Sequence, residues 1–298
     1  MSTVLPAAAE PRLRGAAPPL LAVLVVAGVG MGAVVATAFG LMPLYGQPDL
    51  SLDGWRLNRS DLLLGVRETL LIATASTVVA CLVGLAVASL VLSAGPGARA
   101  VRALAVLVLA LPHLVGAVSY GLLLRDAGLA ERVATSVGLP ESAGWPRFVA
   151  GPWSIATIAE LSWKESAFVA LVVVASLATS HAARTEAAMV LGASPWQRWT
   201  RVFVPASLPA LGASGLIVFV YTVGNYEVAW LLGRAYPEPL PVLAYRLFTS
   251  VDLGDRPAAA AAAAVTAALA LGVAAVAAAL LPRLAAALGR GVGAGGSR

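Results

Sequence analysis

The sequence predicts an all-α, polytopic membrane protein with six transmembrane helices and a helix-turn-helix loop outside the bilayer between the fourth and fifth. Of its 298 residues, 59% are hydrophobic and only 12% are charged, and the mean hydropathy is +0.86. A soluble domain carries about 25% charged residues, so the composition indicates a chain that lies mostly in lipid. Two further observations support this class: the length of the apolar runs, and a charged segment between two of them.

Six predominantly apolar runs have the length of a membrane span, which takes about 20 residues to cross a bilayer core about 30 Å thick. Glycine, proline and polar residues fill the connections between them. We therefore expect an N-terminal segment at 1–19, a six-span domain at 20–282 and a mobile C-terminal tail at 283–298. The runs are Leu20–Met42, Leu70–Ala94, Ala103–Leu124, about Pro152–Ser180, about Ala206–Leu232 and Ala258–Leu281.

The first and last runs each have a second interpretation. Leu20–Met42 is longer than the roughly 7–15 apolar residues of a cleaved signal peptide, so we expect a retained anchor helix instead. The last run is very rich in alanine. Small side chains let helices approach closely in lipid, which favours a packing helix, but a compositional drift toward alanine would produce the same pattern.

The loop arginines do not fix the orientation in the membrane. With six spans both termini lie on one side, and that side carries ten arginines against nine on the other. The positive-inside rule counts Lys and Arg rather than net charge, so these numbers do not decide. The side of the termini has fewer acidic residues, Glu10 and Glu186, which is a weak indication that it is the inner side.

Several kinds of chemistry are disfavoured by the sequence. Lys164, the single lysine, lies in LSWKES rather than in the glycine-rich lead of a P-loop. Cys81 stands alone, and His113 and His181 are far apart without the spacing of a zinc protease. The arginines are scattered at the ends of apolar runs, a pattern that does not favour nucleic-acid binding. We therefore expect no catalytic residue, metal site, bound cofactor or nucleic-acid partner on this chain.

The charged segment Thr185–Pro205, within a loop that we expect at about 181–205, carries a spaced motif. It resembles the cytoplasmic loop of bacterial binding-protein-dependent ABC importer permeases, in which Glu-Ala-Ala, three residues, Gly, nine residues, Ile, one residue and Leu-Pro follow one another. All gaps agree here, with Val in place of Ile and of Leu, and the segment lies between the fourth and fifth spans as in the six-span members. The matching residues are Glu186, Ala187, Ala188, Gly192, Val202, Val204 and Pro205.

The resemblance implies a transporter subunit and its partners. In that family the loop docks on a cytoplasmic ABC ATPase dimer, which binds ATP and Mg²⁺, and each permease pairs with a second permease or a second copy of itself. An extracytoplasmic binding protein delivers the solute. The resemblance therefore implies a multi-pass protein of the bacterial inner membrane, with cytoplasmic termini and no enzymatic activity of its own.

The local sequence of the segment favours two short helices. Ser194 is a good N-cap and Pro195 suits the first helical position. Gly192 allows either a bend and close approach at a docking surface or an ordinary helix C-cap. Glu186 either orients the loop through a neighbouring arginine or is solvated. An amphipathic interfacial helix is the alternative for the whole segment.

A second resemblance concerns the branch of this family. The stretch Val223–Ala262 is similar to permeases for polyamines, ferric iron, thiamine and phosphonates, and Leu191 stands where sugar-type permeases usually have Asp. A sugar-type permease is the alternative within the family. Outside it, the alternatives are an ATP-independent secondary transporter, which would show repeats and broken helices, and a membrane-embedded enzyme, which would need clustered nucleophiles or metal ligands.

A few polar residues within the spans are candidates for lining a pathway, because intramembrane ionisable groups usually face the bundle interior or water. They are Glu160, Lys164, Tyr221, Asn225 and Glu227. An acidic pair of Glu160 and Glu227 would suit a cationic solute. The alternatives are that Lys164 extends to the outer interface and that the other side chains form helix–helix hydrogen bonds.

Overall fold

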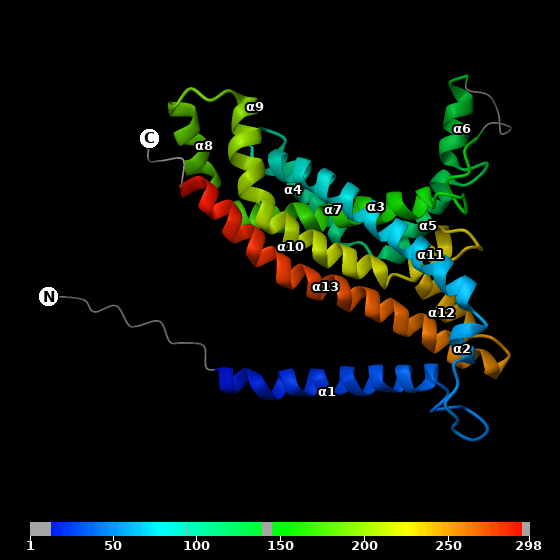
Figure 1. The fold of residues 1–298 in the computed structure, drawn as a ribbon. Helices are drawn as coiled ribbons and strands as arrows, with labels where there is room; N and C mark the ends of the chain where they lie inside the picture. Colours follow the sequence, from blue (N-terminus) through cyan, green and yellow to red (C-terminus); the bar gives the residue numbers. More distant parts are fainter. Residues whose placement is uncertain (1–12, 94, 139–144, 294–298) are drawn as a thin grey trace.

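The computed structural model describes residues 13–93, 95–138 and 145–293, and in these ranges the chain is helical without a strand (Figure 1). The predicted all-α class is confirmed. The helices are α1 (Leu13–Ala38), α2 (Asp53–Arg56), α3 (Arg59–Leu92), α4 (Ala98–Ala110), α5 (His113–Leu124), α6 (Leu129–Ser136), α7 (Ile155–Leu177), α8 (His181–Val190), α9 (Pro195–Arg198), the π-helical turn η1 (Trp199–Phe203), α10 (Val204–Val223), α11 (Glu227–Leu232), α12 (Leu240–Phe248), the 3-10 turn η2 (Leu253–Asp255) and α13 (Arg256–Gly293).

Six candidate membrane spans follow the predicted order when bent helices are counted as single spans. Two of the six are bent pairs: the chain direction changes by 102° between α4 and the segment His113–Ser136, and by 70° between α7 and α8. The four unbroken ones are Pro18–Ala38, Arg59–Leu92, Pro195–Val223 and Leu253–Leu280.

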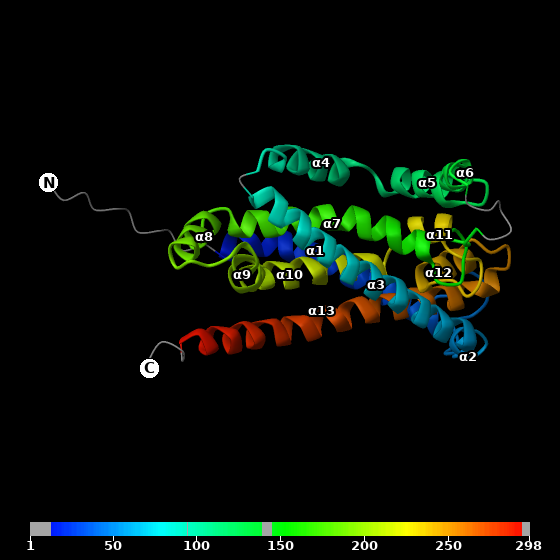
Figure 2. The same ribbon diagram turned by 90° about the horizontal axis from the view of Figure 1, so that it is seen from above.

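Helix α7 is the centre of the bundle and contacts α3, α10, α4 and α5 (Figure 2). Small residues let α3 and α7 approach closely, as expected for helices that associate in lipid by van der Waals contact. A Cβ atom on Gly84 would lie 2.7 Å from the Cβ of Val169. The same buried layer reaches α10 through Val218. The central position of α7 places Lys164 against α4 and Glu160 against α5.

The alanine-rich helix α13 packs closely over its first turns. There its small side chains are buried against leucines of α12, while Leu271 and Val276 farther along are exposed. The packing interpretation of the alanines therefore applies to the beginning of this helix. The buried residues are Ala258, Ala259, Ala261 and Ala262, together with Leu240, Leu243 and Leu247.

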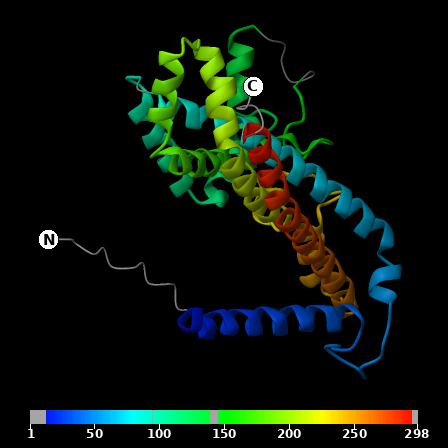
Figure 3. The same cartoon turned by 60° about the vertical axis from the view of Figure 1, so that its left-hand side comes forward.

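Helix α1 joins the bundle at its C-terminal end, where Ala38 is buried and its carbonyl accepts a hydrogen bond from Nε1 of Trp55 at 2.9 Å. Toward its N-terminus α1 diverges from α13 (Figure 3), and its side chains are exposed. The first residues of α1 and the last residues of α13 lie at the end of the bundle from which α8 and α9 project (Figure 1). We call this the loop end, and the opposite one the far end.

The helix boundaries differ from the predicted runs for local reasons. The third span is interrupted at Leu111 and Pro112, because proline has no N–H to continue the hydrogen bonding of a helix. The fifth span ends at Val223 rather than at Leu232, because a turn that begins at Gly224 separates α10 from α11. Helix α13 continues to Gly293, past the tail boundary expected at 282. Residues 1–12 and 294–298 of the expected terminal segments lie outside the described ranges.

A buried ion pair ties segments together at the far end. Glu68 on α3 is almost fully buried, accepts a hydrogen bond from Oγ of Ser154 at 2.6 Å, and pairs with the guanidinium of Arg234. Ser154 precedes α7, and Arg234 follows α11. A buried carboxylate with two partners fixes these three segments relative to one another.

Candidate functional site

The extramembrane segment folds as α8, a tight turn and α9. Helix α8 ends in a Schellman motif, in which Gly192 N–H donates to the Met189 carbonyl at 2.9 Å and Ala193 N–H donates to the Ala188 carbonyl at 3.0 Å. Gly192 has a φ of +77°, a conformation that other residues adopt at a steric cost. The C-cap role of this glycine is therefore present in the structure. No atom lies within 4 Å of a Cβ built on Gly192, so the turn faces open space.

Helix α9 begins with a capping box and continues into the membrane. Oγ of Ser194 accepts from Gln197 N–H at 3.3 Å, and the Gln197 side chain accepts from Ser194 N–H at 2.9 Å. Pro205 cannot donate to the Arg201 carbonyl, and the turn before it is π-helical, with Val204 N–H bonded to the Trp199 carbonyl. Helix, π-turn and α10 form one span from Pro195 to Val223.

Aromatic residues that the motif does not contain anchor this segment to the bundle. Phe203 is buried between α3, α7 and α10, and its ring meets that of His181 edge-on at 5.8 Å. Trp199 packs against the same cluster and stacks on Trp196 at 5.3 Å. Phe203 is the fully buried residue of the run Val202-Phe203-Val204, and Val204 packs against the same cluster at partial burial.

The tip of the segment is apolar and exposed. Val190 is 87% exposed, Leu191 86% and Trp196 69%. Glu186 is also exposed and, among the residues described, no ion pair joins it to an arginine, so its carboxylate is solvated in this state. Apolar side chains gathered at a projecting tip are typical of a protein-docking surface.

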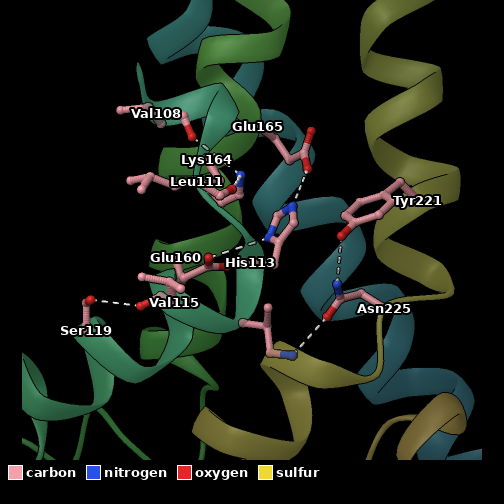
Figure 4. Close-up of polar contacts among 11 residues, drawn as sticks. Val108, Leu111, His113, Val115, Ser119, Glu160, Lys164, Glu165, Tyr221 and Asn225 are labelled. Atoms are coloured by element: carbon pink, nitrogen blue, oxygen red, sulfur yellow. Dashed lines mark hydrogen bonds and ion pairs between the residues drawn. The ribbon is translucent and has the colours of Figure 1, made fainter. Parts of the chain in front are cut away.

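Lys164 forms hydrogen bonds to backbone carbonyls at the break in the third span. Its ammonium group is buried and donates to the carbonyls of Val108, at 3.4 Å, and Leu111 at the C-terminal end of α4 (Figure 4). A cation is stabilised there because the last carbonyls of a helix have no partner within the helix and carry partial negative charge. The interpretation that Lys164 extends to the outer interface is therefore wrong.

His113 lies between two carboxylates of α7. Its Nε2 lies 3.2 Å from Oε1 of Glu165, and its Nδ1 lies 3.5 Å from Oε1 of Glu160 (Figure 4). Glu160 is 0% exposed, and neither of its oxygens has a hydrogen-bond partner within the described protein. The pathway residues expected from the sequence did not include His113 or Glu165. The available signal was the position of the histidine directly after Pro112, at the start of a half-helix within an apolar run.

Tyr221 and Asn225 extend this cluster toward the far end. The Tyr221 ring lies 5.1 Å from the His113 ring, and Asn225 Nδ2 donates to the Tyr221 hydroxyl at 3.2 Å (Figure 4). Asn225 also accepts from Val228 N–H and so caps α11. Glu227 is exposed at the start of α11, outside the fifth span.

The structure thus brings four of the five expected pathway residues together around His113, while Glu227 lies apart. Glu160 is paired with His113 in the described contacts, and the suitability of Glu160 and Glu227 for a cationic solute stays a prediction. The described residues also contain no group of three His, Cys, Asp or Glu side chains that could hold a metal ion. We call His113, Glu160, Glu165 and Tyr221 the polar cluster.

The structure has several candidate membrane spans, a projecting helical loop and a polar cluster at a broken helix. These features define an integral membrane transport component. A family model agrees: the one described as "Binding-protein-dependent transport system inner membrane component" matches residues 80–286. The chain belongs to this family. The family part of the resemblance is thereby confirmed, and the branch stays a prediction.

Two curated relatives are similar to parts of the chain. The inner membrane ABC transporter permease protein YnjC of Escherichia coli (strain K12) is 30% identical over 219 residues, covering 72% of this chain and 41% of YnjC. The molybdenum transport system permease protein ModB of Azotobacter vinelandii is 31% identical over 67 residues, covering 22% of this chain and 30% of ModB. The matches therefore span less than half the length of either relative.

Two solved structures share the fold. A bacterial ABC transporter involved in the import of the acidic polysaccharide alginate has a TM-score of 0.70 at 21% identity, covering 89% of this chain and 93% of that one. An amino acid ABC transporter with histidines has a TM-score of 0.53 at 17% identity, covering 79% and 99%. At these identities the likeness concerns the fold alone.

Proposed function

We propose that this chain is the permease subunit of an ATP-binding-cassette importer and forms half of the translocation pathway for a small solute. The observation that carries the proposal is the continuous span from Pro195, in the exposed segment, to Val223, next to the polar cluster. Its 29 residues extend about 40 Å, which exceeds the bilayer core of about 30 Å. A movement of α9 outside the membrane would therefore be transmitted to Tyr221 along one continuous helical span, without an intervening loop.

The partner that displaces α9 is, in this proposal, an ABC ATPase dimer that binds ATP and Mg²⁺ itself. The exposed tip formed by Val190, Leu191 and Trp196 supports docking, because burying such side chains contributes about 25 cal/mol per Å² of apolar surface. The motif residues Glu186, Ala187 and Ala188 lie on α8, the helix that presents Val190 and Leu191 of this tip. No bond-making step and no cofactor of its own is assigned to the chain.

A second permease, or a second copy of this chain, is proposed to complete the pathway. Tyr221, the member of the polar cluster on α10, is 41% exposed, and ionisable groups in a membrane span rarely face lipid. The family description supports a binding protein as a further partner. Docking of the loop on a cytoplasmic ATPase would place both termini in the cytoplasm, since α1 begins and α13 ends at the loop end (Figure 1).

For the solute we propose the polyamine, thiamine, ferric iron or phosphonate type rather than a sugar. The support is the stretch Val223–Ala262 and the Leu191-Gly192-Ala193 sequence. Molybdenum and alginate belong to the names of the similar proteins and, at the identities and coverages found, do not select the solute here.

The docking proposal is tested with Gly192→Trp and a matched control, Gly46→Trp. Both glycines have positive φ (+77° and +83°) and open space around a built Cβ, so the backbone strain is similar, but Gly46 lies in the loop after α1, at the far end. We expect a tagged ABC ATPase from the same cell to capture wild type and Gly46→Trp, and to capture Gly192→Trp at least tenfold less.

Uptake into proteoliposomes completes this test. ATP-driven uptake that Gly192→Trp abolishes and Gly46→Trp retains would support coupling through the loop. Equal capture of the three proteins, or uptake that needs no ATP, would contradict the proposal and favour a secondary transporter.

A further inference from the structure

We infer that the polar cluster is a binding site for an organic cation, with Glu160 and Glu165 as its acidic groups, and that the transported solute carries an amine. This inference rests on the proposed function, because it narrows the solute of the same pathway. The juxtaposition behind it is two carboxylates of α7 on either side of His113 at the start of a half-helix (Figure 4).

The first observation is the state of Glu160. The residue is 0% exposed, and both carboxylate oxygens lack a hydrogen-bond partner in the described protein. An isolated buried carboxylate is strongly disfavoured unless it is paired. Space for this carboxylate is provided by Gly116 on α5, because a Cβ atom there would overlap Oε1 of Glu160. The surface of α5 is thus shaped around a buried acidic group whose ion-pair neighbour among the described residues, His113, lies 3.5 Å away, too far for a close hydrogen bond.

The second observation is that the neighbouring cation is already bound. Lys164 lies one turn from Glu160 on α7, but its ammonium donates to the carbonyls of Val108 and Leu111. The positive charge of Lys164 therefore offsets the partial negative charge at the C-terminal end of α4 rather than the charge of the Glu160 carboxylate. His113 brings at most one positive charge to two carboxylates. Adding a ligand with a positive charge would satisfy the remaining acceptor oxygens.

The third observation concerns access. The Tyr221 ring is 41% exposed, and beside it the side chains of His113 and Glu165 are 16% and 12% exposed. Charged groups on a membrane face are stable when that face lines water or protein. In the proposed transporter this face borders the pathway between two permeases, where a passing solute meets it.

The chemistry of the lining favours an amine over the other solute types. Two carboxylates would repel a phosphonate or another anion, whereas an ammonium donates hydrogen bonds to both, and the face of the Tyr221 ring attracts a cation. A bare metal ion is disfavoured, because no group of three His, Cys, Asp or Glu ligands occurs in the described part of the chain. Polyamines are the class within the proposed solutes that fits.

The test uses spermidine and putrescine as probes, with a sugar and a phosphonate as comparison solutes, on the detergent-solubilised complex of this chain with its partner subunits. Equilibrium binding is measured for wild type, Glu160→Gln and Gly116→Ala. The second variant keeps every charge and only displaces the Glu160 carboxylate, so it remains informative should Glu160→Gln fold poorly. Asp49→Asn, which removes an exposed carboxylate from the loop after α1, is the charge-matched control.

We expect wild type and Asp49→Asn to bind spermidine equally and both cluster variants to bind it at least tenfold more weakly, the change that corresponds to about 1.4 kcal/mol. Absence of amine binding, equal binding by all four proteins, or stronger binding of the phosphonate would overturn the inference. Failure of the proposed function has a different signature: amine binding that depends on Glu160 in a chain that captures no ATPase.

Discussion

Replacing Lys164 by methionine is expected to lower the free energy of unfolding by about 2–4 kcal/mol. The side chain is buried, and its ammonium donates to the carbonyls of Val108 and Leu111 where α4 ends. A hydrogen bond to a charged group contributes about 1.5–3 kcal/mol, and a partly buried cation at a helix C-terminus adds up to about 2 kcal/mol. The desolvation cost of the lysine disappears in the variant, so the net loss is smaller than the sum of these contributions.

The assay is equilibrium unfolding of the detergent-solubilised chain by increasing SDS, followed by the loss of helical circular dichroism. Arg132→Met is the control, because this exposed cation on α6 makes no ion pair among the residues described and should change stability by less than about 0.5 kcal/mol. If Lys164→Met were as stable as this control, the lysine would not be holding the interrupted third span, and the explanation of the break would be refuted.

The same unfolding assay checks two further sites. Gly84→Ala is expected to lower the free energy of unfolding by about 1–3 kcal/mol, because its Cβ would lie 2.7 Å from the Cβ of Val169. The control is Gly97→Ala, whose Cβ would meet no atom within 4 Å. Equal stability of the two variants would contradict the close contact of α3 with α7. Glu68→Gln leaves the guanidinium of Arg234 without its carboxylate and is expected to lower the free energy of unfolding by about 3 kcal/mol. A decrease below about 1 kcal/mol would mean that the ion pair does not stabilise the far end of the bundle.

The location of Lys164 and the break belong to one arrangement. Helix α4 ends and α5 begins within the third span, so the carbonyls of one and the N–H groups of the other need partners away from water. The lysine supplies the partner for α4, and the carboxylate of Glu160 lies beside the positive end of α5, near Gly116. The i,i+4 spacing of Glu160 and Lys164 on α7 thus matches the two ends of the interruption.

Local sequence features identified the exposed segment in detail. The spacing from Glu186 to Pro205 placed it between the fourth and fifth spans, and Ser194 with Pro195 gave the start of α9 that the structure has. These features depend on neighbouring residues, and hydrogen bonds within one turn decide them. Docking of the segment on an ATPase depends on a second protein and stays a proposal.

The sequence by itself determined the all-helical class, the order of the apolar segments and the helix caps around the exposed segment, because apolar run length and turn chemistry are local quantities. Only the tertiary structure placed His113 beside Glu160 and Glu165, 47 and 52 positions away in the chain, and directed Lys164 to the end of α4. It also joined α9 to α10 and ended that span at Val223. A pattern of apolar residues predicts that a helix is in lipid, whereas the side chain across from a given polar group depends on how distant helices pack.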